Sequence, residues 1–177
     1  MTSRQVTPSQ TIGPFFHDCI LRDDVRCDTI VGDAGSERIR VEGRVLDGDG
    51  EGVPDAVLEV WQEAGFARVG TENDGGFSFT TARPKAVPFD RASMQAPHLS
   101  VAVFARGLLN HLFTRIYFAD EPSTPADPVL HRVPDTRRAT LIAARDDDGS
   151  LTPTYRFDIV LQGQGETVFF DFKRPGR

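Results

Sequence analysis

Cysteine is scarce in this sequence, and its scarcity narrows the range of possible sites. Cys19 and Cys27 are the only cysteines among 177 residues, and neither belongs to a CxxC motif or lies near clustered histidines. A disulfide framework or a thiolate metal site is therefore not expected. A local disulfide between the two stays open, but two reduced thiols in a cytoplasmic protein are the state that the pattern favours.

A net positive charge and long apolar runs are also lacking. The formal net charge is −6, and no basic stripe is interleaved with aromatic residues. This argues against nucleic acid and against an anionic membrane surface as partners. No apolar stretch approaches the roughly 20 residues that cross a bilayer, and the N-terminus has no apolar core of a secretory signal. The expected location is the cytoplasm.

Several catalytic motifs are missing as well. The sequence has no GxSxG nucleophile elbow, no GxxxxGK[ST] loop and no GxGxxG after a predicted strand. The acidic, glycine-rich segment 47–52 lacks the spaced carboxylates of a calcium loop, so it is interpreted as a tight hairpin turn.

Strand-forming residues and turn residues are abundant instead. The chain contains 13 Phe, 16 Gly and 12 Pro, a composition typical of many short strands joined by turns. Ile39, Val41 and Val45 alternate with charged residues, which predicts a half-buried strand. Further strands are expected at 56–62, 77–81, 98–105, 112–119, 155–161 and 167–172.

These elements predict an all-β fold, an antiparallel two-sheet β-sandwich with one or two short helices. Asp127 followed by Pro128 has the signature of a short helix start, and residues 136–144 are expected to form a second helix. Residues 1–37 lack a clean period and are predicted to be an irregular N-terminal arm. Residues 38–177 are predicted to form the single β-rich domain.

An ordered set of motifs across nearly the whole chain resembles the alpha-type subunits of the protocatechuate 3,4-dioxygenase family of intradiol dioxygenases. Each motif alone is weak, whereas the set in this order is specific. The matching segments are 7–17, 41–47, 58–62, 95–100, 104–107, 114–118, 155–159 and 162–172.

The resemblance implies a β-sandwich in an enzyme that cleaves catechol rings with O₂ at a ferric non-haem iron. In the family's catalytic beta chain two tyrosines and two histidines hold the iron, and the histidines form an H-x-H on a strand. Here that segment has His98 and Ser100, so a hydroxyl replaces the second imidazole. Val87 stands where one tyrosine would lie, and residues 63–70, which match the region of the other, contain no tyrosine. No metal is therefore expected in this chain, and His98, Ser100 and Val87 are interpreted as a plugged pseudo-site.

The resemblance also implies a partner, an iron-bearing beta-type chain that forms αβ pairs in a larger oligomer. The alpha chain's contribution to the partner's pocket for an aromatic catechol acid falls on Thr11, Gly13, Pro14 and Arg106. Glycine permits close approach of the backbone, proline stiffens it, and arginine is a permanent cation suited to a carboxylate. Without the resemblance, Thr11 to Pro14 would be an arm-anchoring turn and Arg106 a solvated or ion-paired surface residue.

Two other functions remain open at this stage. One is a stand-alone catechol intradiol dioxygenase, which the missing ligands disfavour. The other is a non-enzymatic binding module, because residues 43–57 and 74–77 also resemble small transthyretin-like or regulatory-like sandwiches. The module does not account for the matches that flank this core.

Overall fold

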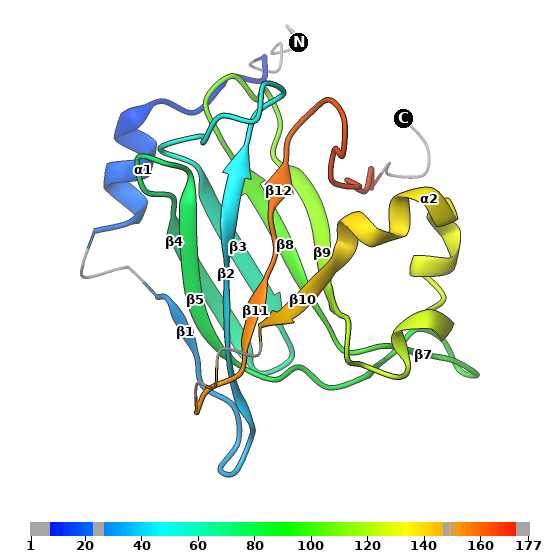
Figure 1. Cartoon of the computed structure of the whole chain (residues 1–177). Coiled ribbons are helices and arrows are strands. Elements are labelled where there is room, and N and C mark those ends of the chain that lie inside the picture. Colours follow the sequence, from blue (N-terminus) through cyan, green and yellow to red (C-terminus); the bar gives the residue numbers. More distant parts are fainter. Residues whose placement is uncertain (1–7, 23–26, 147–148, 150, 173–177) are drawn as a thin grey trace, which may run out of the picture.

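The strands of the chain form one large mixed sheet, seen in a computed structural model that describes residues 8–22, 27–146, 149 and 151–172 (Figure 1). The ten-stranded sheet has the order β1-β5-β2-β11-β10-β9-β8-β3-β4, and β12 pairs with β2. Its strands are β1 (Thr29–Ile30), β2 (Arg38–Leu46), β3 (Val57–Gln62), β4 (Gly65–Gly70), β5 (Gly76–Ala82), β8 (His98–Phe104), β9 (Leu112–Phe118), β10 (Ile142–Asp146), β11 (Thr154–Arg156) and β12 (Ile159–Val160). A separate two-stranded sheet joins β6 (Val87–Pro88) to β7 (Met94–Gln95).

The large sheet curls around its own core until its two ends meet. In Figure 1, β5, β2 and β11 lie in front of β3, β8 and β9. At the ends, β1 contacts β4, and the Arg68 amide donates to the Cys27 carbonyl oxygen at 2.6 Å. The enclosed core contains fully buried side chains from both layers, among them Ile39, Val41, Leu58 and Ile116. The alternation of apolar and polar residues therefore buries one face of β2 and of β5, as the sequence predicts.

The predominantly β fold with few helices is confirmed, but the antiparallel two-sheet arrangement is found only in part. Four strand pairs are parallel, namely β1 with β5, β10 with β9, β11 with β2 and β12 with β2. Parallel neighbours need a crossover connection rather than a hairpin. The helical segment 124–141 supplies that crossover between β9 and β10, so one sheet continues where two were expected.

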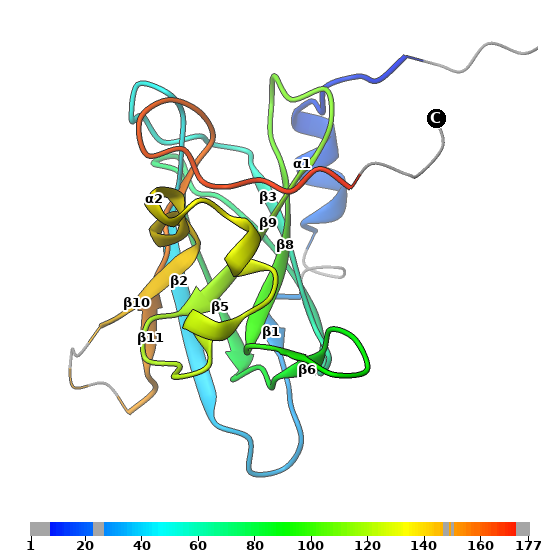
Figure 2. The same ribbon diagram turned by 90° about the vertical axis from the view of Figure 1, so that its right-hand side faces the viewer.

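The helices are short and lie on opposite sides of the sheet (Figures 1 and 2). α1 (Pro14–Ile20) packs beside the β8 end, with the rings of Phe16 and Phe104 5.8 Å apart. The other side carries η1 (Thr124–Ala126), η2 (Leu130–Arg132), α2 (Asp135–Arg138) and η3 (Ala139–Leu141). The irregular arm predicted at 1–37 is thus corrected within its described part: a helix starts at Pro14, where proline suits the first helical position. Residues 1–7 and 23–26 of that arm lie outside the described residues.

Two other element predictions also need correction. The helix expected at 136–144 stops at Leu141, and residues from Ile142 onward form β10 because Ile142 pairs with Tyr117 of β9. The strand expected at 167–172 is reduced to one bridge, between Phe113 and Phe170. A helical turn does follow Asp127, but it starts at Leu130 with Val129, not Asp127, at its N-terminal cap. The Asp127 carboxylate accepts the amides of Val129 and Leu130 at 2.9 and 2.8 Å.

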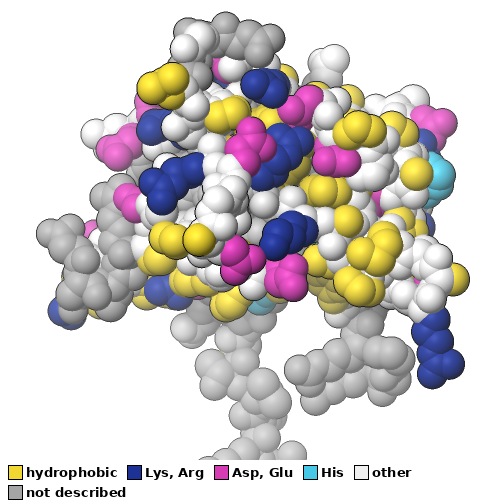
Figure 3. Space-filling view, turned by 90° about the horizontal axis from the view of Figure 1, so that it is seen from below, with side chains coloured by type: hydrophobic (Ala, Val, Ile, Leu, Met, Phe, Trp, Pro, Cys, Tyr) yellow, Lys and Arg dark blue, Asp and Glu magenta, His cyan; other side chains and the backbone are white. Residues whose placement is uncertain are grey.

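Two further expectations concern the thiols and the membrane. Cys19 is exposed and Cys27 is half-buried, and no disulfide joins them. Among the described residues, no helix is long and apolar enough to span a bilayer. The end of the molecule shown in Figure 3 carries basic and acidic side chains side by side, without a field of one sign.

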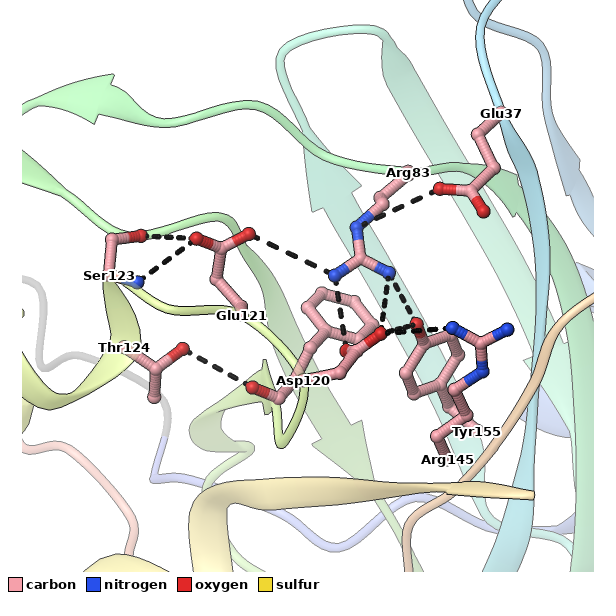
Figure 4. Close-up of polar contacts among 9 residues, drawn as sticks. Glu37, Arg83, Asp120, Glu121, Ser123, Thr124, Arg145 and Tyr155 are labelled. Atoms are coloured by element: carbon pink, nitrogen blue, oxygen red, sulfur yellow. Dashed lines mark hydrogen bonds and ion pairs between the residues drawn. The ribbon is translucent and has the colours of Figure 1, made fainter. Parts of the chain in front are cut away.

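A polar network ties β5, β11 and the turn after β9 together (Figure 4). Arg83 donates to the hydroxyl of Tyr155 and pairs with Asp120 at 3.1 Å, and the Tyr155 hydroxyl donates to Asp120 at 2.9 Å. Burial acts to raise the pKa of Asp120, but the hydrogen bonds from Arg83 and Tyr155 outweigh it and hold this pKa below its ordinary value. The network therefore stabilises the fold only while Asp120 is ionised.

We expect Asp120→Asn to lower the free energy of unfolding by about 1 kcal/mol at pH 7, after allowance for solvent screening. Because the folded pKa is depressed, the stabilisation is complete above the unfolded pKa of about 3.9 and disappears as the pH falls through the lower folded value. Urea unfolding of both proteins at pH 7 and pH 3 checks this. A difference that persisted unchanged at pH 3 would contradict an ionic origin.

Candidate functional site

The N-terminal arm and the turn after β8 come together at one candidate site. The amide of Gly107 donates to the Thr11 hydroxyl at 2.8 Å, which fixes the arm beside Arg106. Gly107 has a φ of +84°, a left-handed conformation that favours glycine and allows this tight turn. The structure therefore brings Thr11 next to Arg106, although 95 positions separate them in the sequence.

Arg106 is held on its other side by a residue that the sequence does not single out. Its Nε lies 3.3 Å from Oδ2 of Asp55, and its side chain is 54% exposed. Asp55 has a φ of +62°, the one non-glycine residue in the left-handed region among the described residues. Aspartate tolerates this conformation better than most side chains. Asp55 thus orients the Arg106 guanidinium at the surface, where much of the side chain faces solvent.

Gly13 and Pro14 lie where the arm turns into α1. The carbonyl oxygen of Gly13 accepts the Phe16 amide at 3.0 Å, and Pro14 is the first residue of the helix. A Cβ placed at Gly13 would meet no atom within 4 Å. Nothing in the described part of the chain therefore requires glycine there, and its backbone is open to an approaching molecule.

The three residues of the predicted pseudo-site line one hollow of about 210 Å³. His98 and Ser100 are two apart on β8 and face the same side of the strand. Val87 of β6 lies on the wall of the same hollow, with Trp61 and Pro84. Trp61 is cross-strand neighbour to Ser100 and is 51% exposed. The structure thus gathers residues that the sequence links only through resemblance.

The chemistry of His98 is that of a neutral, partly buried imidazole. Its Nδ1 lies 2.7 Å from the carbonyl oxygen of Ala96. Burial and the nearby Arg115 guanidinium lower the pKa of His98, so its ring is uncharged at neutral pH. A neutral imidazole that is tied down at one nitrogen can offer only the other as a ligand or acceptor.

These donors do not fit a ferric iron. The hollow offers one imidazole, the hydroxyl of Ser100 and the hydrocarbon side chain of Val87, whereas ferric iron favours several anionic oxygen and imidazole ligands together. Tyr117 and Tyr155 are fully buried, and their hydroxyls are hydrogen-bonded to Asp127 and Asp120. Within the described ranges, no group of three His, Cys, Asp or Glu side chains could hold a metal ion.

Sequence reasoning missed Asp55 and Arg115. Asp55 follows Pro54 in an ordinary turn pattern, and only the three-dimensional pairing with Arg106 indicates a role. Arg115 is opposite Ser100 in the β8–β9 ladder, and its guanidinium donates to Gln95 and Tyr117 at 2.8 and 3.1 Å. An arginine in a strand that is otherwise apolar was the one signal available for it.

Comparison with known proteins finds relatives that match nearly the whole chain. No protein-family model matches the chain. The alpha chain of protocatechuate 3,4-dioxygenase from Burkholderia cepacia is 41% identical, over 97% of this chain and 100% of that protein. The Pseudomonas putida alpha chain is 39% identical, over 94% and 96%. The Burkholderia cepacia beta chain is 28% identical, over 90% of this chain and 77% of that one.

A solved structure gives the same fold. The dioxygenase domain of a carbohydrate-binding fusion from Streptomyces sp. SirexAA-E has a TM-score of 0.61 at 21% identity, over 78% of this chain and 88% of that one. The alpha-chain likeness spans the arm, the Arg106 turn and the hollow around His98. The chain therefore belongs to the protocatechuate 3,4-dioxygenase alpha-chain family and is a subunit of an intradiol ring-cleaving dioxygenase.

Proposed function

We propose that this chain is the iron-free alpha subunit of an enzyme that cleaves 3,4-dihydroxybenzoate to 3-carboxy-cis,cis-muconate, incorporating both atoms of O₂. It pairs with an iron-bearing beta-type chain, in αβ pairs of a larger oligomer in the cytoplasm. The observation that carries the proposal is the pairing of full-length alpha-chain similarity with a donor set at His98, Ser100 and Val87 that does not fit iron. The partner's ferric iron would supply the redox chemistry.

The contribution proposed for this chain is to wall the partner's substrate pocket with its arm and the Arg106 turn. Residues 1–37 act as the arm and residues 38–177 as one domain. The Thr11 hydroxyl anchors the arm at Gly107, and Gly13 presents backbone without a side chain. Pro14 fixes the chain direction at the start of α1. Arg106, half-exposed and permanently charged, is placed to attract or orient a substrate carboxylate.

A second role is proposed for the hollow around His98, that of a pseudo-site without metal. Ser100 and Val87 occupy positions where the family's catalytic chain has iron ligands, and Trp61 and Pro84 line the same hollow. Burial and the Arg115 guanidinium lower the pKa of His98 and so weaken it as a base, and its Nδ1 is tied to the Ala96 carbonyl oxygen, so its proposed role is that of a packed polar residue.

The proposal is tested by iron content and activity of this chain alone and after co-expression with a beta-type chain. We expect near-zero iron and no ring cleavage for the chain alone. We expect one iron per αβ pair, with cleavage of 3,4-dihydroxybenzoate, for the complex. Elemental analysis and the loss of substrate absorbance measure the two quantities.

Three controls separate the alternatives. Stoichiometric iron and activity in the chain alone would identify a stand-alone dioxygenase. A well-folded monomer that ignored the beta-type chain in a pull-down would identify a binding module. The ring-cleavage activity of the beta-type chain expressed alone shows how much of the activity of the complex does not depend on this chain.

A further inference from the structure

A second cavity, of about 460 Å³, lies between β9, η2 and the C-terminal segment. Its volume is within the range of small-molecule pockets. Its apolar walls include Val133, Phe89 and Phe170, so a flat hydrophobic ring could pack against aromatic faces. None of the residues placed in the arm site or in the pseudo-site lines it. The cavity therefore needs its own explanation.

Two guanidinium groups line this cavity. Arg115 is held by hydrogen bonds to Gln95 and Tyr117 and lies 6.0 Å from the Phe170 ring centre. Arg132 is exposed and lies 5.2 Å from the ring centre of Phe89. Within the described part of the chain, no carboxylate forms an ion pair with either arginine. The cavity thus has two cations that form no ion pair with a described residue.

The arrangement of Arg115 is that of a built site rather than a loose surface charge. The Tyr117 hydroxyl that supports it donates in turn to buried Asp127 at 2.9 Å, so the support reaches into the core. Guanidinium groups bind carboxylates through parallel hydrogen bonds, and fixing the donor in advance lowers the entropy that binding costs. The lining also contains the exposed Asp171, which leaves a net positive charge of one.

We propose that this cavity binds a small aromatic carboxylate, with the carboxylate group at Arg115 and Arg132 and the ring between Phe89 and Phe170. A ligand with a carboxylate but no ring would leave the aromatic walls without a contact. A ligand with a ring but no carboxylate would leave the two guanidinium groups without an anion. The proposal does not rest on the function proposed above.

The test uses the full chain co-expressed with a beta-type partner, and radiolabelled benzoate in equilibrium dialysis. We expect one bound benzoate per copy of this chain in addition to any bound at the partner's iron. Arg132→Gln should weaken this additional binding about tenfold, the effect of one charged contact of about 1.4 kcal/mol. Arg132 is exposed and makes no hydrogen bond within the described residues, so this variant keeps the fold.

Controls identify the chemistry that is recognised. Arg38→Gln removes an exposed arginine of β2 away from the cavity and should leave benzoate binding unchanged. Benzamide, which keeps the ring but not the charge, should not compete, and acetate should compete only at far higher concentration. Arg115→Gln should weaken binding at least as much as Arg132→Gln.

Three results would overturn the proposal. They are no benzoate bound beyond the partner's site, equal binding by wild type and Arg132→Gln, and competition by acetate as strong as by benzoate. The first would also be the result if a segment of the partner chain filled the cavity in the complex.

Discussion

Asp127→Ala is expected to lower the free energy of unfolding by about 4 kcal/mol, because it leaves several buried donors without a partner. Asp127 is 1% exposed. Its Oδ2 accepts the Ala96 amide at 2.8 Å, and its Oδ1 accepts the Tyr117 hydroxyl and the amides of Val129 and Leu130. One carboxylate thus joins the entry to β8, the end of β9 and the start of η2.

Urea unfolding followed by circular dichroism measures this loss. Asp127→Asn should have an intermediate effect, about 2 kcal/mol. The asparagine side chain keeps one acceptor oxygen, but its NH2 group replaces the other oxygen and faces a backbone or hydroxyl donor that it cannot accept. Asp135→Ala is the matched control, because that carboxylate is 85% exposed and, among the described residues, forms an ion pair with Arg138 alone. Its expected change is within about 0.5 kcal/mol. A loss below 1 kcal/mol for Asp127→Ala would mean that water replaces the carboxylate in the core.

The strands of the core could be predicted because their side chains obey a local rule. Alternation of apolar and polar residues locates β2, β3 and β5, and the two-faced apolar runs locate β8 and β9. Alternation cannot predict whether the neighbouring strand in the sheet runs parallel or antiparallel. The parallel pairing of β10 with β9 depends on the crossover through residues 124–141, and no local pattern records that path.

Residues 136–146 illustrate a competition between local and tertiary preference. The segment contains Thr140, Leu141 and Ile142 among alanines and arginines, and its local pattern favours a helix. Pairing of Ile142 with Tyr117 and of Ala144 with Arg156 outweighs that preference from Ile142 onward. Sheet hydrogen bonds with two neighbours decide the conformation there.

The candidate site divides in the same way. The spacing of His98 and Ser100 predicts that both face one side of a strand, and the structure places them so. The link between Arg106 and Asp55 could not be predicted, because it depends on a left-handed residue and on two turns meeting in space. Sequence reasoning thus identified the residue types but not the contacts that orient them.

Arg106→Gln is expected to raise the KM of the assembled enzyme for 3,4-dihydroxybenzoate about tenfold, with a smaller change in kcat. A contact between a cation and a carboxylate contributes about 1.5 kcal/mol or more when partly screened, and a tenfold change in binding corresponds to about 1.4 kcal/mol. Arg106 binds substrate in this scheme but touches no bond that breaks, so its removal weakens ground state and transition state alike. Steady-state kinetics on the complex separates the two constants.

Arg40→Gln is the matched control for this variant. Its Nε lies 3.2 Å from Glu42, and its side chain is 48% exposed, close to the 3.3 Å and 54% of Arg106. Both substitutions remove one exposed, ion-paired arginine, so a general effect of charge on the complex would appear equally in the two. Catechol, which lacks the carboxylate, provides the second comparison: its KM should be indifferent to Arg106→Gln. If both substrates and both variants retained wild-type constants, Arg106 would be a surface residue paired with Asp55 and nothing more.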